Sequence, residues 1–246
     1  MSNVEPLVRV EAVSKQFPAD GQARVHAVTH VSLHIDHGET LAVVGESGCG
    51  KSTLANLIIR LHDPDEGRVL LKGLDITNLG PHEIRPHRKT MQIVFQDPFA
   101  SLDPRVRVGK AVAEPLKVHG ITTGEAAEER AANLFKLVGL DQSMLRNFPH
   151  QFSGGQRQRV CIARALALNP ELVIADEAVS ALDVSVQAQV MNLMLKLQQE
   201  LGLSYLFISH DLAVVERIAH RVAVIKFTGG VLHRPAPNIV GDDVPC

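Results

Sequence analysis

The sequence predicts an α/β fold, in which helices cover the faces of a mainly parallel sheet. Short apolar runs, typical of buried strands, alternate along the chain with segments of helical periodicity. One apolar run leads into a glycine-rich loop at 45–53, and another ends at the acidic pair Asp176 and Glu177. The chain has 246 residues, 45% of them hydrophobic, which is enough for one large domain, or a domain with an inserted lobe.

The first 96 residues predict strands around one helix. Two segments alternate apolar and polar side chains, as half-buried strands do, and a third is continuously apolar, as a buried strand is. A helix follows the glycine-rich loop and ends at a cluster of turn residues, after which two further strands are expected. In chain order these elements are 7–13, 25–35, 41–44, the helix from Lys51 to Leu61, the turn at 63–67, and the strands 69–71 and 91–95.

The character of the sequence changes after Gln96. Residues 97–105 contain two prolines and predict a loop, and a mostly helical stretch continues to about residue 150. Thr122 and Glu125 fit a capping box at the start of one helix, and Gly139 follows its end. The apolar stripe of that helix is Ala127, Ala131, Leu134 and Val138. We therefore expect an inserted helical lobe at 97–159, between core segments 1–96 and 160–246.

The last third of the chain returns to alternating helices and strands. Asn169 and Pro170 end the helix that follows the second glycine motif, and Gly202 ends a long helix. That long helix carries an apolar face made of Val186, Val190, Leu193, Met194, Leu197 and Leu201. The expected elements are helix 154–168, strand 172–175, helix 185–201, strand 204–209, helix 212–220 and strand 222–225.

Charge and cysteine content exclude several classes of protein. The formal net charge is −2, and short basic groups at 85–89 and 157–164 are interpreted as solvated faces, so nucleic acid is not an expected partner. No apolar stretch is long enough to span a membrane, and the first residues lack the apolar core of a signal peptide. Three widely spaced cysteines indicate a reducing compartment rather than a disulfide framework or a zinc site.

The loop at 45–53 fits the pattern G-x-x-x-x-G-K-[ST], which binds triphosphates. Its glycines allow successive N–H groups to face phosphate oxygens, and the helix that begins at Lys51 adds the positive end of its dipole. Lys51 places a full charge near the β- and γ-phosphates, and the Ser52 hydroxyl is a ligand for Mg²⁺. The residues assigned to this site are Gly45, Glu46, Ser47, Gly48, Cys49, Gly50, Lys51, Ser52 and Thr53.

The acidic pair follows the apolar run 172–175, at the edge where open α/β sheets bind ligands. The Asp176 carboxylate can hold Mg²⁺ directly or through water. Glu177 is suited to orient, or accept a proton from, the water that attacks the γ-phosphate. An exposed acidic turn is the alternative for the pair considered alone.

A second glycine motif begins a helix at Ser153. Ser153 and Gln156 have the spacing of a capping box, and Gly154 and Gly155 leave the N–H groups of the first turn uncovered. The motif is therefore a second anion site of the same physical kind as the first. A capped helix without a ligand is the alternative.

Four single residues complete the candidate site. Gln96 follows a strand, and its amide can ligate Mg²⁺ or hold the attacking water. His210 follows the strand 204–209 and can donate a hydrogen bond to a γ-phosphate, although a buried core histidine is the alternative. Phe17 can stack on a nucleotide base or pack in the core. Cys49 is interpreted as a small residue within the loop, and the alternative is that its oxidation blocks nucleotide binding.

In this order, the motifs resemble those of the ATP-binding subunits of ATP-binding-cassette transporters, over roughly residues 7–225. The resemblance assigns 45–53 to the Walker A loop, Gln96 to the Q-loop and 152–156 to the signature motif, with Phe152 in place of the usual Leu. It assigns 172–176 to Walker B, with Glu177 as the catalytic glutamate, and 180–183 to the D-loop. His210 corresponds to the switch histidine, and Phe17 to the aromatic residue that stacks on adenine.

The resemblance implies an ATP-hydrolysing P-loop NTPase (RecA-like) with a mainly parallel sheet, an N-terminal antiparallel β subdomain and an inserted helical lobe. It assigns catalytic roles to Lys51, Glu177 and His210. Mg²⁺ would be held by Ser52, Gln96 and Asp176.

Longer segments narrow the resemblance to the peptide-importer branch, and most closely to the second ATPase half of glutathione importers; these segments are FQDPFASLDPR, FSGGQRQR, ADEAVSALDVSVQAQ and YLFISHDLAVVERIAHRVAV. The implied partners are a second ATP-binding subunit, identical or different, two membrane permeases gripped by the helical lobe, and indirectly a substrate-binding protein. The implied location is peripheral, at the cytoplasmic face of the inner membrane.

The tail departs from the family pattern. After 222–225 the family usually continues with a Leu-Gly turn, a return strand and a long extension, whereas this chain reads KFTGGVLHRPAPNIVGDDVPC. Thr228, Gly229 and Gly230 can still form a hairpin turn, but the extension is missing. Two alternatives to a transport ATPase stay open: a soluble cassette ATPase of another complex, and a truncated, non-catalytic interaction subunit.

Overall fold

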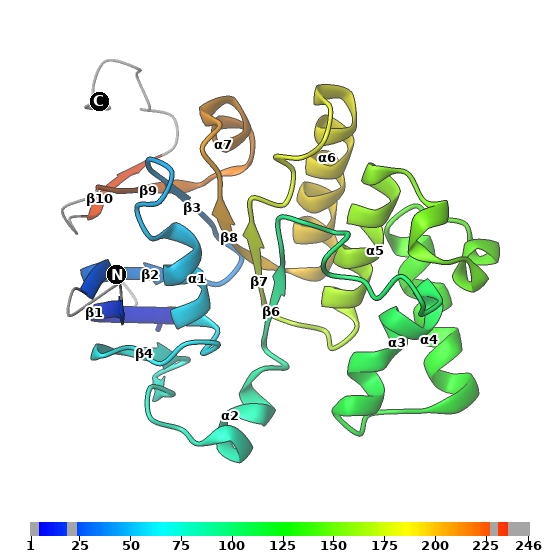
Figure 1. The fold of residues 1–246 in the computed structure, drawn as a ribbon, viewed down its shortest axis with the longest axis horizontal. Coiled ribbons are helices and arrows are strands. Elements are labelled where there is room, and N and C mark those ends of the chain that lie inside the picture. The colour runs from blue at the N-terminus through cyan, green and yellow to red at the C-terminus, as the bar shows by residue number, and fades with distance from the viewer. Residues whose placement is uncertain (1–4, 19–23, 227–230, 236–246) are drawn as a thin grey trace. The chain divides into compact units, whose positions relative to one another are not determined.

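The computed structural model describes residues 5–18, 24–226 and 231–235. The contacts within the chain divide it into two compact units (Figure 1), described separately below. Unit 1 comprises the described residues up to Ile84 and those from Ser204 onward, and unit 2 is Arg85–Leu203. The predicted helical lobe at 97–159 therefore lies wholly within unit 2, together with two strands and a long helix.

Unit 1 contains the antiparallel sheet, in the order β2-β1-β4-β5. Alternate side chains of β1, such as Val8 and Val10, are buried, which is the alternation expected of a half-buried strand. Val8 pairs with Ile35 of β2 on one side and with Leu71 of β4 on the other. The strands are β1 (Val8–Pro18), β2 (Arg24–Ile35), β4 (Glu66–Leu71) and β5 (Leu74–Asp75).

Unit 1 also contains strands β10, β9, β3 and β8, which lie side by side in that order. All residues of β3 are buried, and this strand is parallel to β8 on one side and to β9 on the other, as is typical of an interior strand in a parallel sheet that is covered on both faces. β10 pairs antiparallel with β9, and the turn predicted at 228–230 lies outside the described residues. The strands are β3 (Thr40–Val44), β8 (Ser204–Ile208), β9 (Arg221–Ile225) and β10 (Val231–Pro235).

Helix α1 ends three residues earlier than the sequence predicted. It spans Lys51–Ile58, and Arg60 then adopts the left-handed conformation with φ 58°. The Leu61 N–H bonds to the carbonyl of Asn56, which is the hydrogen-bond pattern that closes many helices. Arg60 tolerates this backbone because its buried guanidinium is held by the carbonyls of Ile76 and Leu79. The other helices of unit 1 are α2 (Pro81–His87), whose last three residues belong to unit 2, and α7 (Leu212–Ile218).

Unit 2 pairs two parallel strands and packs four helices. Met91 of β6 lies opposite Leu172 of β7. Helix α3 contacts both α4 and α5, and α5 contacts α6. The elements are β6 (Met91–Val94), α3 (Val108–Val118), α4 (Gly124–Leu137), the 3₁₀ turns η1 (Gln142–Arg146) and η2 (Pro149–Gln151), α5 (Gly154–Leu166), β7 (Leu172–Asp176) and α6 (Val184–Leu201).

The predicted start of α4 was wrong, although its buried face was correct. The cap residue is Thr123, without a side-chain cap hydrogen bond, so Thr122 and Glu125 do not form the expected capping box. The predicted stripe is buried throughout, and Gly139 adopts φ 73° beyond the helix end. Burial of that stripe against α3 and α5, rather than a cap, therefore accounts for the helix.

Helix α6 confirms the predicted stop signal and most of the predicted face. Asp183 caps its start by accepting from the Val186 N–H at 3.0 Å, and Gly202 follows it with φ 66°. Leu201 is 49% exposed instead of buried, because it is the last residue of the helix. Over the described ranges, no helix combines the length and the apolar character needed to cross a bilayer.

Candidate functional site

The glycine-rich loop joins β3 to α1, and its shape depends on two glycines. Gly50 caps the helix at φ 94°, and a Cβ atom there would collide with the carbonyl oxygen of Ala27. A Cβ atom at Gly45 would collide with the carbonyl oxygen of Ile225. The loop can therefore lie close to two neighbouring strands only because both positions lack a side chain.

Lys51 is the only charged residue of this loop that is buried, at 5% exposure. Its Nζ donates to the carbonyl oxygens of Gly45 at 2.8 Å and Glu46 at 2.7 Å. Cys49 is also buried, and its Sγ lies 3.8 Å from the same Nζ. These bonds hold the lysine cation over the loop, where the sequence predicted a phosphate contact.

The other polar side chains of the loop 45–53 differ in how exposed they are. Ser52 is exposed and Thr53 is half-buried, on the first turn of α1. Glu46 and Ser47 are exposed. The hydroxyl predicted to bind Mg²⁺ thus lies at the surface of unit 1.

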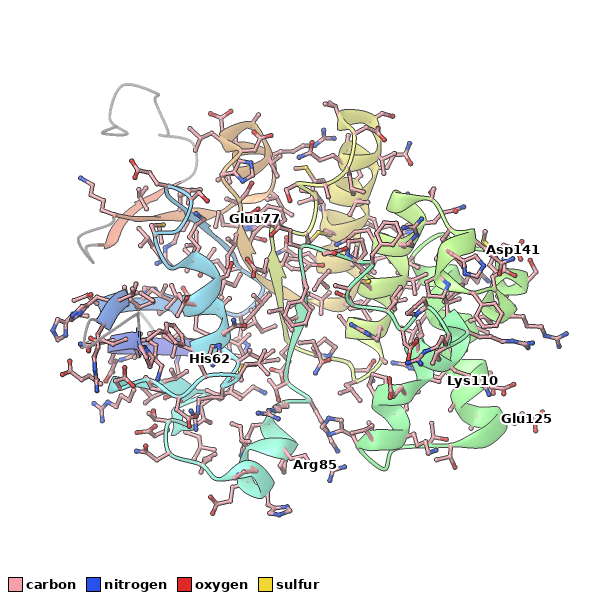
Figure 2. The ribbon with its side chains drawn as sticks, in the orientation of Figure 1. His62, Arg85, Lys110, Glu125, Asp141 and Glu177 are labelled. Carbon is pink, nitrogen blue, oxygen red and sulfur yellow. The ribbon has the colours of Figure 1, made fainter. Side chains whose placement is uncertain are left out.

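Unit 2 places the acidic pair at the end of β7. Asp176 is the last residue of the strand and is 8% exposed. Glu177 (Figure 2) is half-buried and adopts φ 48°, a conformation that costs an ordinary residue about 1–2 kcal/mol. Its carbonyl accepts hydrogen bonds from the N–H and the hydroxyl of Ser180, which hold this turn. Gln96 is exposed, two residues beyond the end of β6.

The second glycine motif forms the predicted capping box. The Gln156 N–H donates to Ser153 Oγ at 3.3 Å, and the Ser153 N–H donates to Gln156 Oε1 at 2.9 Å. Gly155 is buried, and a Cβ atom there would collide with Cγ1 of Val186 in α6. The glycine therefore also permits close packing of α5 on α6, a role that the sequence analysis did not assign.

The sequence analysis interpreted Arg157 as part of a solvated face, which was wrong, because this side chain is half-buried. Its Nε donates to the carbonyl of Phe152 at 2.9 Å, and its guanidinium carbon lies 3.4 Å from the centre of the Phe99 ring. Burial lowers the pKa of Arg157 from its usual value. The side chain thus connects the loop after Gln96 to the start of α5. No sequence pattern marks such a contact, because it joins residues 58 positions apart in a loop and a helix.

His210 and Phe17 both lie in unit 1. His210 is exposed, two residues beyond β8, so the alternative of a buried core histidine was wrong. Phe17 is half-buried near the end of β1, and its ring meets His62 edge-on at 5.5 Å between centroids. Lys15 Nζ also lies over the ring, 5.8 Å from its centroid. The stacking of Phe17 on adenine stays a prediction.

The candidate residues thus fall into two sets. Unit 1 holds Phe17, the loop 45–53 and His210, and unit 2 holds Gln96, 153–156 and the acidic pair. Among the described residues, no group of three or more His, Cys, Asp or Glu is arranged to hold a metal.

Comparison with known proteins identifies the family. The model of the ABC transporter family matches residues 28–180, which include the glycine-rich loop, the second glycine motif and the acidic pair. The chain belongs to the ABC transporter family. This ABC cassette is 51% identical, over 227 residues, to the glutathione import ATP-binding protein GsiA of Escherichia coli, and 52% identical to the probable peptide ABC transporter ATP-binding protein y4tS of Sinorhizobium fredii.

The alignments cover 90% of this chain in both cases, but only 36% of GsiA and 64% of y4tS. This ABC cassette therefore spans about a third of the length of GsiA. Among solved structures, the dimeric ABC cassette MJ0796 bound to ADP and phosphate matches with a TM-score of 0.84 and 33% identity, covering 93% of this chain and 98% of that one. The α/β cassette fold predicted from the sequence is confirmed.

Proposed function

We propose that the chain is the ATP-hydrolysing subunit of an importer that takes up small peptides or glutathione. The observation that carries the proposal is the buried Lys51 at the start of α1, within a loop whose glycines bring its backbone against neighbouring strands. The relatives at about half identity are named for glutathione and peptide transport. A phosphate loop in such a chain supports ATP as the nucleotide.

In unit 1, the residues of the loop would bind the triphosphate. Lys51 already points its Nζ at two loop carbonyls, and it would exchange these bonds for β- and γ-phosphate oxygens. The N–H groups at the start of α1 would add further donors. Phe17 would stack on the adenine, and His210 would donate to the γ-phosphate.

In unit 2, Glu177 would orient the attacking water and accept its proton, and Asp176 would hold the Mg²⁺ ion that accompanies the nucleotide. When bound, Mg²⁺ supplies charge neutralisation between the β- and γ-phosphates. Ser52, Gln96 and Asp176 provide the hydroxyl, amide and carboxylate oxygens that suit this ion. The strained backbone of Glu177 supports a functional role, because such strain is concentrated at active sites.

The signature motif would act on nucleotide held by a second ATP-binding subunit. Its first turn is capped by Ser153 and carries Gly154 and Gly155, which add no side chain of their own beside the N–H groups of that turn. The related cassette MJ0796 is described as a dimer in a post-hydrolysis state. We infer that two subunits, identical or different, enclose the nucleotides between them.

The helical lobe would bind the permeases. Its α3, α4 and η1 surround a groove of about 1490 Å³, lined by residues such as Lys110, Ala113, Glu125 and Arg146. Figure 2 labels Lys110 of α3 and Glu125 of α4 in this lobe. A groove of this size admits a short helix of a partner protein. The chain would then lie at the cytoplasmic face of the inner membrane, and a substrate-binding protein would deliver cargo on the opposite side.

Glu177→Gln tests the catalytic assignment. We expect this variant to bind ATP with unchanged affinity, to lose at least a hundred-fold in Mg²⁺-dependent hydrolysis, on the order of the effect of a missing catalytic base, and to accumulate as an ATP-bound dimer. Phosphate release, nucleotide binding by fluorescence and gel filtration measure the three properties.

Glu200→Gln is the matched control, because this glutamate lies on the exposed surface of α6, where it pairs with Lys196. It should hydrolyse ATP at the wild-type rate. Normal turnover by Glu177→Gln would overturn the assignment. Absence of hydrolysis by the wild-type chain together with its permeases would favour a non-catalytic subunit.

Reconstitution with co-purifying permeases tests the transport function. Glutathione, dipeptides and longer peptides would be added with the substrate-binding protein, and stimulation of hydrolysis would identify the cargo. Co-purification with soluble proteins alone would contradict a role in transport.

A further inference from the structure

A cluster of basic residues lies at the carboxyl end of α3. The Arg85 guanidinium donates to the carbonyl of Val118, the last residue of this helix. The last turn of α2 is therefore held beside the carboxyl end of α3. Figure 2 labels Arg85 at this edge of unit 2.

The electrostatic environment of His119 shows that several cations converge here. Its pKa is lowered by burial and then by the charges of Lys89, Arg85 and Arg88. Lys117, in the last turn of α3, adds an exposed ammonium two residues away.

Exposed apolar side chains adjoin the cations. Val118 is 51% exposed and Ile121 is 50% exposed, and both lie at the end of α3 or just beyond it. Cations beside exposed aliphatic groups are typical of surfaces that lie on lipid headgroups. We call this surface the basic–apolar patch; its members are the exposed Arg85, Lys117, Val118 and Ile121 and the half-buried Arg88, Lys89 and His119.

We propose that the basic–apolar patch contacts the anionic surface of a phospholipid membrane. Charge complementarity favours this occupant, since the whole chain is slightly acidic and only a local cluster can draw it to a negative surface. The apolar members favour a lipid surface over free phosphate, which offers them nothing to contact. This inference rests on the proposed transport function, because that function places the subunit at a membrane.

The position of the patch agrees with that function. Lys117 belongs both to the patch and to the lining of the groove between α3 and α4. A permease segment that binds in that groove would extend from the membrane. The patch would then lie on the same side of the lobe as the bilayer and would orient the subunit on it.

A vesicle sedimentation experiment on the purified full chain tests the inference. Phosphatidylcholine vesicles with and without phosphatidylglycerol would be compared at low and high salt. We expect binding only to the anionic vesicles, and loss of this binding at high salt, because salt screens surface charges. Lys89→Gln/Lys117→Gln should weaken binding roughly thirty-fold, from about 1 kcal/mol for each cation.

Two further variants separate the contributions. Val118→Asn/Ile121→Asn should weaken binding to the same vesicles, while Lys136→Gln/Lys196→Gln, which removes two exposed lysines elsewhere on unit 2, should bind as the wild type does. All variants retain Arg85, whose bond to Val118 contributes to the fold.

Equal binding by Lys89→Gln/Lys117→Gln and the wild type would overturn the inference, as would wild-type binding that does not depend on anionic lipid. ATP hydrolysis measured without vesicles tests the proposed function separately. Failure of one proposal can therefore be distinguished from failure of the other.

Discussion

Single residues decide whether the phosphate loop can form. Gly48 and Gly50 both have positive φ values, 81° and 94°. A Cβ atom at Gly48 would meet nothing within 4 Å, whereas one at Gly50 would collide with the carbonyl of Ala27. An alanine would therefore have a strained backbone at either position, but it would collide with a neighbouring residue only at position 50.

Gly48→Ala should lower the free energy of unfolding by about 1–2 kcal/mol, the cost of the left-handed conformation. Gly50→Ala should cost roughly 1–3 kcal/mol more, because the added methyl group forces a backbone shift. Urea denaturation of the two variants measures the difference. Equal losses would show that the close approach of the loop to Ala27 is not present in solution.

Helix packing adds a second constraint on the signature motif. Gly155 lies where α5 touches the first turn of α6, against Val186. The same glycine is proposed to expose N–H groups to phosphate. Packing and binding thus both require a glycine here, so loss of activity in a Gly155 variant has two possible causes.

A double variant separates these causes. Gly155→Ala should destabilise the chain by about 1–3 kcal/mol, the usual cost of overpacking. Val186→Ala removes Cγ1, the atom with which the added methyl group would collide. Gly155→Ala/Val186→Ala should therefore be more stable than the sum of the single effects predicts. Additive losses would contradict the packing role. ATP hydrolysis by the double variant then reports on the phosphate contact itself.

Unit 1 as a whole is assembled from both ends of the chain. Glu39, only 8% exposed, pairs with Arg221 at 2.9 Å, and the Thr40 N–H donates to His220 Nδ1 at 3.0 Å. These contacts span about 180 positions and hold β9 against β3. They lie at the amino end of β3, whereas the phosphate loop follows its carboxyl end.

Removing one member of this ion pair should be costly. Arg221→Met leaves the Glu39 carboxylate buried without its cation, and we expect a loss of about 3 kcal/mol in unfolding free energy. Arg221→Met/Glu39→Gln should recover part of that loss, because the amide carries no charge. Thermal unfolding followed by circular dichroism measures both. A single variant as stable as the wild type would show that Glu39 is solvated.

Local sequence patterns were sufficient for most elements of the fold. The continuous apolar run at 41–44 predicted a buried strand, and Ser153 with Gln156 predicted a capped helix start; both are confirmed. Errors occurred at element ends, where competing interactions decide. Leu61 was assigned to α1, but the side-chain bonds of Arg60 stabilise an earlier stop.

Residue spacing could indicate the candidate site because glycine loops, caps and carboxylates after strands act over a few neighbouring residues. It could not show that Lys51 bonds the carbonyls of its own loop, or that Glu177 has a strained backbone.

The α/β class, the order of the motifs and the family follow from short-range patterns, because strand and helix periods and turn residues are local properties of the chain. The contact of Arg157 with Phe99, the packing of Gly155 on Val186 and the convergence of cations around His119 required the folded structure. Each joins segments that are distant in sequence, and only packing brings them together.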